Sequence, residues 1–437
     1  MKRKLVSLIT AAVLLALPLL AAAEEARRES PYVLDKVVIL SRHNIRSPMS
    51  GSGSLLKEIT PHDWFRWTSD PSELSLRGAV LETLMGQYFR LWLEDAGLIP
   101  KNWQPEEGEV RFYANARQRT LATARYFSAG LLPVYSAPVE SRAPYDTMDD
   151  TFTPKIRYDS AEYREAALRE IAAMGGEKGI EGCAERLRDA VSLLMDVTDM
   201  GDSEAYRAGK YGDLLNDETA VVLLPDREPG LAGPLRTATS VADALVLQYY
   251  EEPDTLKAAF GHELTREDWH TLCGIVETYL GILYSSPLVS VNAAYPLLCE
   301  LRSELEQEGR IFSFLCGHDS NLVSVLSALG AEEYELPGTL ESRAPIGAKL
   351  VFERYLDADG AAWYAVNLVY QSTEQLRQIA PLSLENPPMK AALRFRGAAA
   401  NPDGLISEAD LLECFRKAID AFDALPEEYG DDLEAAA

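Results

Sequence analysis

The chain is organised around the stretch Val37-Val38-Ile39-Leu40-Ser41-Arg42-His43-Asn44-Ile45-Arg46-Ser47-Pro48. Its first four residues form an apolar run, which predicts a buried strand. The polar residues follow where that strand ends, and open α/β sheets bind their ligands at the carboxyl ends of strands. His43 stands between Arg42 and Arg46, so two arginines can grip a phosphate while the imidazole attacks phosphorus. The competing interpretation is a surface loop with two solvated arginines.

Two later segments repeat this arrangement of a strand followed by polar residues. The run Ile311–Cys316 predicts a buried strand, and His318-Asp319 then opens a helix, where anions bind well. An aspartate at such a place is most often only a helix cap. Residues 110–114 predict another strand, after which Asn115 is expected to cap a helix together with Gln118. Arg117 and Arg119 fall in the first turn of that helix, and their spacing alone does not choose between them.

The pattern becomes mostly helical between about residues 146 and 287. Helices are expected at 160–174, 184–197, 239–250 and, from a Thr265/Asp268 capping box, 265–283. We therefore divide the chain into residues 1–23, an α/β part at 24–145, an inserted α-helical domain at 146–287, and a second α/β part at 288–437. Two further strands, 349–355 and 363–370, are expected to form a hairpin, and Ser407 with Asp410 begins a C-terminal helix.

Export is predicted from the first 23 residues. Lys2, Arg3 and Lys4 precede an apolar run that ends in Ala21-Ala22-Ala23, as in a cleavable signal peptide. An uncleaved anchor is the alternative, because the run is almost long enough to span a membrane. We expect a periplasmic or secreted protein without membrane contact after cleavage. The 437 residues carry a formal charge of −26, which makes nucleic acid and anionic membrane surfaces poor partners.

Five cysteines are present, and their spacing shows no disulfide framework. Cys316 and Cys414 are expected to be small core residues. The cysteine and histidine spacing suggests no zinc site. We therefore expect neither a metal nor another cofactor.

The paired motifs resemble those of the histidine acid phosphatases. Asn44 is similar to the glucose-1-phosphatase branch of that family, as are the segments 145–149 (YDTMD), 317–321 (GHDSN) and 345–349 (PIGAK). The resemblance runs from about Val37 to Arg377. It implies the phosphoglycerate mutase-like histidine phosphatase fold: an α/β protein whose mixed central sheet is flanked by helices, interrupted by a smaller, mostly α-helical domain. The site is then expected in the cleft between the two.

The resemblance also implies residue roles. His43 matches the nucleophile, which forms a phosphohistidine, and Asp319 matches the proton donor to the leaving alcohol. The residues that match phosphate or substrate contacts in the family are Arg42, Arg46, Arg119, His318 and Glu228. Arg119 is preferred to Arg117 because it stands in a Gln-Arg-Thr stretch. Glu228 matches an acidic residue of the leaving-group pocket, although an acidic residue in a turn is usually just solvated. Three arginines and a histidine neutralise the phosphate oxygens, so this chemistry requires no metal.

We therefore expect a metal-independent acid phosphomonoesterase that acts on small phosphate monoesters such as glucose 1-phosphate. The first alternative is a phytase acting on inositol hexakisphosphate, and the second is a secreted, non-catalytic phosphosugar-binding protein. Enteric relatives hold several disulfides, including one that flanks the stretch equivalent to residues 396–405, and this chain has no cysteine pair there. The sequence leaves open the natural substrate, the pH optimum, the pairing of the cysteines and the oligomeric state.

Overall fold

The computed structural model of the chain describes residues 31–430. The predicted signal peptide lies outside the described residues. The central sheet has the strand order β10-β8-β7-β1-β6-β2-β3, with β9 paired to β8. Its strands are β1 (Val33–Arg42), β2 (Val110–Ala114), β3 (Val139–Glu140), β6 (Phe312–Gly317), β7 (Lys349–Leu356), β8 (Ala362–Tyr370), β9 (Met389–Ala392) and β10 (Ile406–Ser407).

The sheet is mixed. Strands β1, β6, β2 and β3 are parallel neighbours, whereas β7 pairs antiparallel with both β1 and β8. Strand β1 is buried on both faces, which is why its sequence is a continuous apolar run and not an alternating one. Val37 and Ile39 pack into one core cluster, and Val38 and Leu40 into the other.

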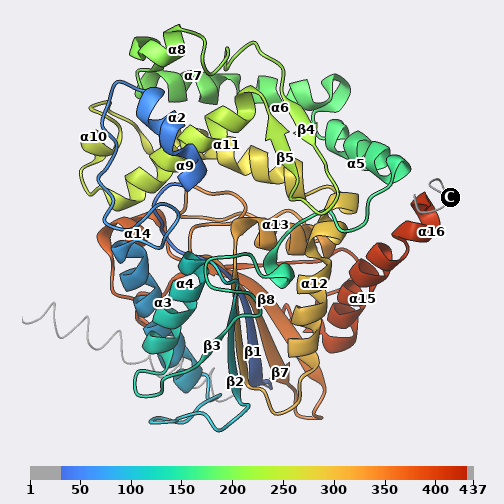
Figure 1. Cartoon of the computed structure of the whole chain (residues 1–437). Coiled ribbons are helices and arrows are strands. Elements are labelled where there is room, and N and C mark those ends of the chain that lie inside the picture. The colour runs from blue at the N-terminus through green and yellow to red at the C-terminus, as the bar shows by residue number, and fades with distance from the viewer. Residues whose placement is uncertain (1–30, 431–437) are drawn as a thin grey trace, which may run out of the picture.

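Helices cover both faces of the sheet (Figure 1). On one side lie α3 (Leu76–Asp95) and α4 (Gln118–Leu131), which supply Phe89 and Phe127 to the cluster around Ile39. On the other side lie α12 (Pro287–Glu306), α13 (Asp319–Ala328) and α15 (Glu408–Asp423). This arrangement confirms the predicted α/β class with a mixed, helix-flanked sheet.

A mostly helical region lies beyond the carboxyl ends of the parallel strands, at the top of Figure 1. Its helices are α5 (Ala161–Ala173), α6 (Ile180–Arg186), α7 (Arg188–Val197), α8 (Glu204–Arg207), α9 (Pro234–Glu251), α10 (Thr255–Ala258) and α11 (Arg266–Tyr284). A small sheet of β4 (Ala220–Val222) and β5 (Gly230–Ala232) accompanies them. The single helix expected at 184–197 is wrong. The α-helical hydrogen-bond pattern is interrupted at Leu187, whose N–H donates to the carbonyl of Ala184, three residues back instead of four. Two helices result. The domain boundaries that we drew stay a prediction.

The remaining short helices are α2 (Gly53–Glu58), α14 (Thr373–Gln378) and α16 (Leu425–Tyr429). The capping box of Thr265 and Asp268, the hairpin of β7 and β8, and the N-cap by Ser407 are all confirmed. All five cysteines lie in the described part of the chain and are free thiols, with Cys316 and Cys414 buried as expected. Among residues 31–430, no single helix is long and apolar enough to cross a membrane. The bent pair α11 and α12 meets the length and composition test only when taken together.

Candidate active site

Three neighbouring parallel strands bring the polar motifs together. Arg42, the last residue of β1, pairs with Gly317, the last residue of β6, and Ala114 at the end of β2 pairs with Cys316. His43, His318 and Asn115 each follow directly, so residues up to 275 positions apart in the chain become neighbours at one sheet edge. The imidazole rings of His43 and His318 meet edge to face, with centroids 5.5 Å apart.

A cavity of about 500 Å³ opens over this edge. The predicted residues that line it are His43, Arg46, Arg119, Glu228, His318 and Asp319. The remaining one, Arg42, lies behind Asp319, with its Nη2 3.0 Å from the carboxylate. The structure thus brings together all seven residues expected at the site. The opposite wall comes from the helical region, through Asp243 on α9 and Tyr279 on α11.

The ring of His43 is held in one tautomer. Its Nδ1 lies 2.8 Å from the backbone oxygen of Asn44. A carbonyl can only accept a hydrogen bond, so Nδ1 carries the proton and Nε2 is left with a free lone pair. Burial, together with the positive charge of Arg119, lowers the pKa of His43 well below 6.5. The imidazole therefore stays neutral in mildly acidic solution, as a nucleophile must.

Three buried guanidinium groups surround this ring. Arg46 pairs with Asp243 at 3.1 Å, and Arg42 pairs with Asp319. Burial and the charges of Arg46 and Arg117 lower the pKa of Arg119 to about 9. The Nε atoms of Arg42, Arg46 and Arg119 are buried and make no hydrogen bond to any described residue. The cluster therefore concentrates donors and positive charge that an anion in the cavity would neutralise.

Asp319 is the acidic member of the cluster. Burial alone would raise the pKa of its carboxyl, but the charges of Arg42 and Arg46 outweigh burial and lower that pKa below its ordinary value. Asp319 begins α13, and its Oδ1 accepts the N–H of Ser320. The N-cap of α13 is His318, not Asp319. Asp319 therefore has two roles: its Oδ1 bonds the backbone of the neighbouring Ser320, and its side chain also lines the cavity.

The loop that carries His43 rests on a buried polar layer. Asn44 donates from Nδ2 to Glu82, and Glu82 in turn pairs with Lys349, both of them fully buried. Gly347 has a φ of +69°, and a Cβ there would come within 2.5 Å of Asn44 Nδ2. This close approach requires a glycine at position 347 and explains why a buried amide suits position 44.

Glu228 lies on the turn before β5, at the mouth of the cavity. The residue is exposed to solvent, and it lines the cavity. Burial raises the pKa of the Glu228 carboxyl, and the charge of Arg119 opposes that shift. Arg117 and Arg236 line the same cavity, so its outer part carries both signs of charge.

Asn115 does not cap a helix, and that prediction is wrong. Helix α4 begins at Gln118 with Arg117 as its N-cap and no side-chain capping bond. The amide of Asn115 instead contacts Nε2 of His318 at 2.7 Å, because the end of β2 lies beside the end of β6. Sequence reasoning also missed Asp243. The only available signal was an acidic residue within the apolar stretch of 241–247, which periodicity alone assigns to the core.

Groups of three or more His, Cys, Asp or Glu side chains able to hold a metal ion do not occur within residues 31–430. The arrangement offers a neutral imidazole, a carboxylate and three guanidinium groups around one cavity. Together these groups suit the transfer of a phosphoryl group from oxygen to nitrogen.

Comparison with known proteins agrees with this chemistry. The family model of the histidine phosphatase superfamily, branch 2, matches residues 33–174. Glucose-1-phosphatase of Salmonella typhimurium (strain LT2) is 34% identical over 91% of this chain and 95% of its own length. Glucose-1-phosphatase of Providencia rettgeri is 33% identical over 96% and 100%. The structure of Hafnia alvei phytase in complex with myo-inositol hexakis sulphate superposes with a TM-score of 0.80 at 25% identity, covering 89% of this chain and 98% of that one.

The fold and the site define a phosphoric monoester hydrolase. The chain belongs to branch 2 of the histidine phosphatase superfamily, the group of the histidine acid phosphatases. The resemblance stated from the paired motifs is thereby confirmed, and so is the prediction of an enzyme. The alternative of a non-catalytic binding protein is not supported.

Proposed function

We propose that this enzyme hydrolyses sugar phosphates such as glucose 1-phosphate, without a metal ion, through a phosphohistidine at His43. The observation that carries the proposal is the tautomer of His43. The bond from Nδ1 to the Asn44 carbonyl leaves Nε2 unprotonated among three arginines and next to Asp319. Binding alone would require neither a neutral imidazole nor an acid at this position.

The first step transfers the phosphoryl group to the enzyme. Nε2 of His43 forms a bond to phosphorus while the bond from phosphorus to the sugar oxygen breaks, and Asp319 gives its proton to that oxygen. Arg42, Arg46, Arg119 and His318 hold the non-bridging oxygens. In the second step a water molecule attacks phosphorus and transfers its proton to the Asp319 carboxylate. The N–P bond breaks, and inorganic phosphate leaves with His43 restored as neutral imidazole.

Acidic solution supplies the proton that Asp319 needs. In the empty site Arg42 and Arg46 keep Asp319 ionised. A phosphate monoester carries one proton below its second pKa of about 6 and can bring that proton into the site. Once bound, the phosphate also takes up the charge of Arg42 and Arg46, so the carboxyl can hold the proton until the leaving oxygen needs it. We therefore propose an acidic optimum.

Substrate choice depends on the outer part of the cavity. The Glu228 carboxylate can accept hydrogen bonds from sugar hydroxyls and repels a leaving group that already carries several phosphates. This favours glucose 1-phosphate, in line with the two similar glucose-1-phosphatases. Phytate is the second candidate, because Arg117 and Arg236 line the same cavity and because a similar solved structure is a phytase.

The decisive experiment compares kcat/KM for glucose 1-phosphate and phytate at acidic pH in the presence of EDTA. Wild type should prefer glucose 1-phosphate, and Glu228→Gln should lose part of that preference while p-nitrophenyl phosphate is still hydrolysed. His43→Ala should abolish turnover of every substrate, by at least about 10⁴-fold. A large preference for phytate would contradict the substrate assignment. Turnover that EDTA abolishes, or that His43→Ala retains, would contradict the mechanism.

We also propose that the mature enzyme is periplasmic or secreted. The support is the signal-like segment that ends in Ala21-Ala22-Ala23. N-terminal sequencing of the protein from an expressing bacterium should begin at Glu24, and the activity should appear in the periplasmic or extracellular fraction. An intact N-terminus in the membrane fraction would support the uncleaved anchor instead.

A further inference from the structure

Both ring nitrogens of His318 lie next to atoms that can only donate. Nε2 is 2.7 Å from the side-chain nitrogen of Asn115, and Nδ1 is 3.4 Å from Nη2 of Arg119. A neutral imidazole accepts at one nitrogen only, because the other carries the proton. One of these two contacts is therefore a hydrogen bond and the other is not.

The orientation of Asn115 decides between them. Its Oδ1 lies 2.9 Å from the backbone nitrogen of Asp149, and a backbone N–H can only donate. The oxygen of the amide must face Asp149, so the NH₂ group must face His318. Nε2 then accepts from Asn115, and the ring proton sits on Nδ1. That nitrogen lies beside Arg119, which lines the cavity, so its N–H joins the arginine donors there.

Which nitrogen carries the proton matters because the His318 ring is neutral. Burial and the charge of Arg119 lower the pKa of His318 well below 6.5, so the ring has a single N–H in mildly acidic solution. With the proton on Nδ1, this N–H lies beside Arg119 at the cavity wall, where it can donate to a bound phosphate. In the other tautomer, a bare lone pair would face the oxygens of a phosphate and repel them.

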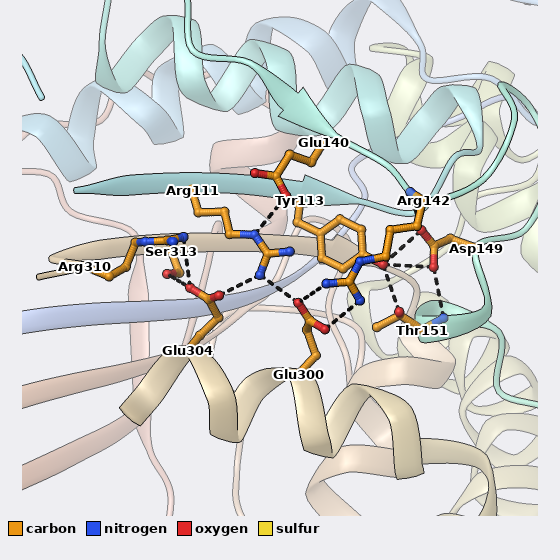
Figure 2. A network of polar contacts seen from close by, with 10 residues as sticks. All are labelled: Arg111, Tyr113, Glu140, Arg142, Asp149, Thr151, Glu300, Glu304, Arg310 and Ser313. Carbon is orange, nitrogen blue, oxygen red and sulfur yellow. Dashed lines mark hydrogen bonds and ion pairs between the residues drawn. The ribbon is translucent and has the colours of Figure 1, made fainter. Parts of the chain in front are cut away.

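The residues that fix Asp149, and through it Asn115, form the network of Figure 2. The Asp149 carboxylate accepts from the Tyr113 hydroxyl at 2.9 Å and from the backbone N–H of Arg142 at 2.8 Å. The ring of Tyr113 lies between the guanidinium groups of Arg111 and Arg142, at 4.8 and 4.7 Å. Both arginines pair with Glu300 on α12. Asp149 is thus held directly from β2 and from the chain after β3, and α12 holds Arg142 in place through Glu300.

We propose that Asn115 is a positioning residue of the phosphatase site: its amide donates to Nε2 of His318 and keeps the ring proton on Nδ1, the nitrogen that faces the phosphate. The inference rests on the proposed function for its consequence in catalysis, but the tautomer itself exists without substrate. Asn115 has no contact with the phosphate in this scheme and acts only through His318.

The first test measures the tautomer in the unmodified enzyme. Long-range ¹H–¹⁵N spectra of protein labelled on histidine distinguish a protonated from an unprotonated ring nitrogen. The chain has five histidines, and loss of one ring system in His318→Gln identifies the relevant one. We expect protonated Nδ1 and unprotonated Nε2 in His318. The opposite pattern overturns the proposal, whatever the activity of the enzyme.

The second test inverts the tautomer with Asn115→Asp, which keeps the size of the side chain. One oxygen of the introduced carboxylate still accepts from Asp149, and the other now accepts from Nε2. The proton moves to Nε2, and kcat/KM should fall by about 100-fold, as when one donor to a developing oxyanion is removed. The carboxylate also raises the pKa of His318, and the imidazolium has an N–H on both nitrogens. The defect should therefore shrink as pH falls.

A matched control is Asn292→Asp. Asn292 is also fully buried, and its amide bridges the backbone of Arg157 and Tyr158, none of which lines the cavity. Both variants put a carboxylate in place of a clamped, buried amide. In Asn292→Asp one carboxylate oxygen faces the Tyr158 carbonyl, so this variant should lose at least as much thermal stability as Asn115→Asp, but it should keep wild-type kcat/KM. A pH-independent defect in Asn115→Asp, or a defect equal to that of the control, overturns the positioning role. Absence of phosphatase activity in wild type would instead refute the proposed function and leave the tautomer result standing.

Discussion

The buried pair of Glu82 and Lys349 beneath the nucleophile loop allows a quantitative test. Nζ of Lys349 lies 3.1 Å from both carboxylate oxygens of Glu82, and neither side chain reaches solvent. The same nitrogen also donates to the carbonyl of Gly347, 2.8 Å away, and Asn44 donates to Glu82 from above. Lys349→Met keeps most of the apolar stem of the side chain and removes its charge together with its hydrogen-bond donors.

The expected loss follows from leaving Glu82 without its cation. Breaking a buried ion pair by removing one partner costs about 3–5 kcal/mol, because an uncompensated charge remains. Unfolding entropy is about 2.1 cal/mol/K per residue, so for the roughly 400 described residues this loss lowers Tm by about 4–6 °C. The double variant Glu82→Gln/Lys349→Met has no buried charge, and its glutamine still accepts from Asn44. It should therefore recover most of the stability.

The pH dependence of this loss has a definite sign. Burial raises the pKa of Glu82, and Lys349 opposes that shift in the wild type. Without Lys349 the folded-state pKa rises further above the unfolded value of about 4.3, so the folded protein binds the extra proton. A raised folded pKa gives stability at low pH that is lost as pH increases. The deficit of Lys349→Met relative to wild type should therefore be larger at about pH 8 than at about pH 5.

Thermal unfolding followed by circular dichroism at both pH values measures this difference. The double variant serves as the control: it has neither Glu82 nor Lys349, so its deficit should not grow as pH rises. A single variant as stable as wild type, or a deficit that shrinks as pH rises, would refute the reasoning that the charge of Glu82 is the source of the cost.

The charges around the cavity set three more outcomes. Asp319→Asn should slow hydrolysis of glucose 1-phosphate by about 10²–10⁴-fold but affect p-nitrophenyl phosphate much less, because nitrophenolate leaves without a proton; equal losses would contradict an acid role. The lowered pKa of His43 keeps its imidazole neutral in acidic solution, so the acidic limb of the kcat/KM profile should lie well below pH 6.5. An acidic limb at or above pH 6.5 would contradict the lowered pKa of His43. Arg119→Lys should raise the inhibition constant of inorganic phosphate by about tenfold, because a lysine cannot bind two phosphate oxygens at once as an arginine does. The increase should be greater at alkaline pH, where a lysine buried beside Arg46 and Arg117 loses its proton. Measuring the inhibition constant at an acidic and an alkaline pH checks both points.

The strands of the sheet core were predictable because they are buried on both faces. An apolar run such as 37–40 or 311–316 has one structural interpretation when polar residues follow at once, and the register of β1 with β6 then brings Arg42 and His318 to one edge. The helical region was predictable in kind from its periodicity. Its details were not, since the break at Leu187 lies inside one continuous amphipathic pattern.

The inner site was predictable only where the residue type itself suggests the chemistry. A histidine between arginines at a strand end points to phosphate even without a partner, whereas Asn115 has a stronger local interpretation as a helix cap. That local interpretation failed because the end of β2 lies beside β6, and the resulting contact with His318 spans 203 positions in the chain. Asp243 was missed for a related reason. The role of an aspartate in an apolar helix cannot be predicted without its partner, and that partner, Arg46, lies 3.1 Å away on a distant segment of the chain.

The tautomers of His43 and His318 also depend on contacts that the sequence does not reveal. Each ring is fixed by a group that sequence reasoning gives no chemical role: the backbone carbonyl of Asn44 for His43, and the side-chain amide of Asn115 for His318. The first contact leaves an unprotonated nitrogen available for attack, and the second places a protonated nitrogen beside the arginines. One neighbouring acceptor and one neighbouring donor thus give the two histidines different roles: His43 attacks phosphorus and His318 donates to the phosphate. Their ring centroids are 5.5 Å apart. The same burial that lowers both pKa values makes this assignment hold, because a protonated ring would present donors on both nitrogens and lose the distinction.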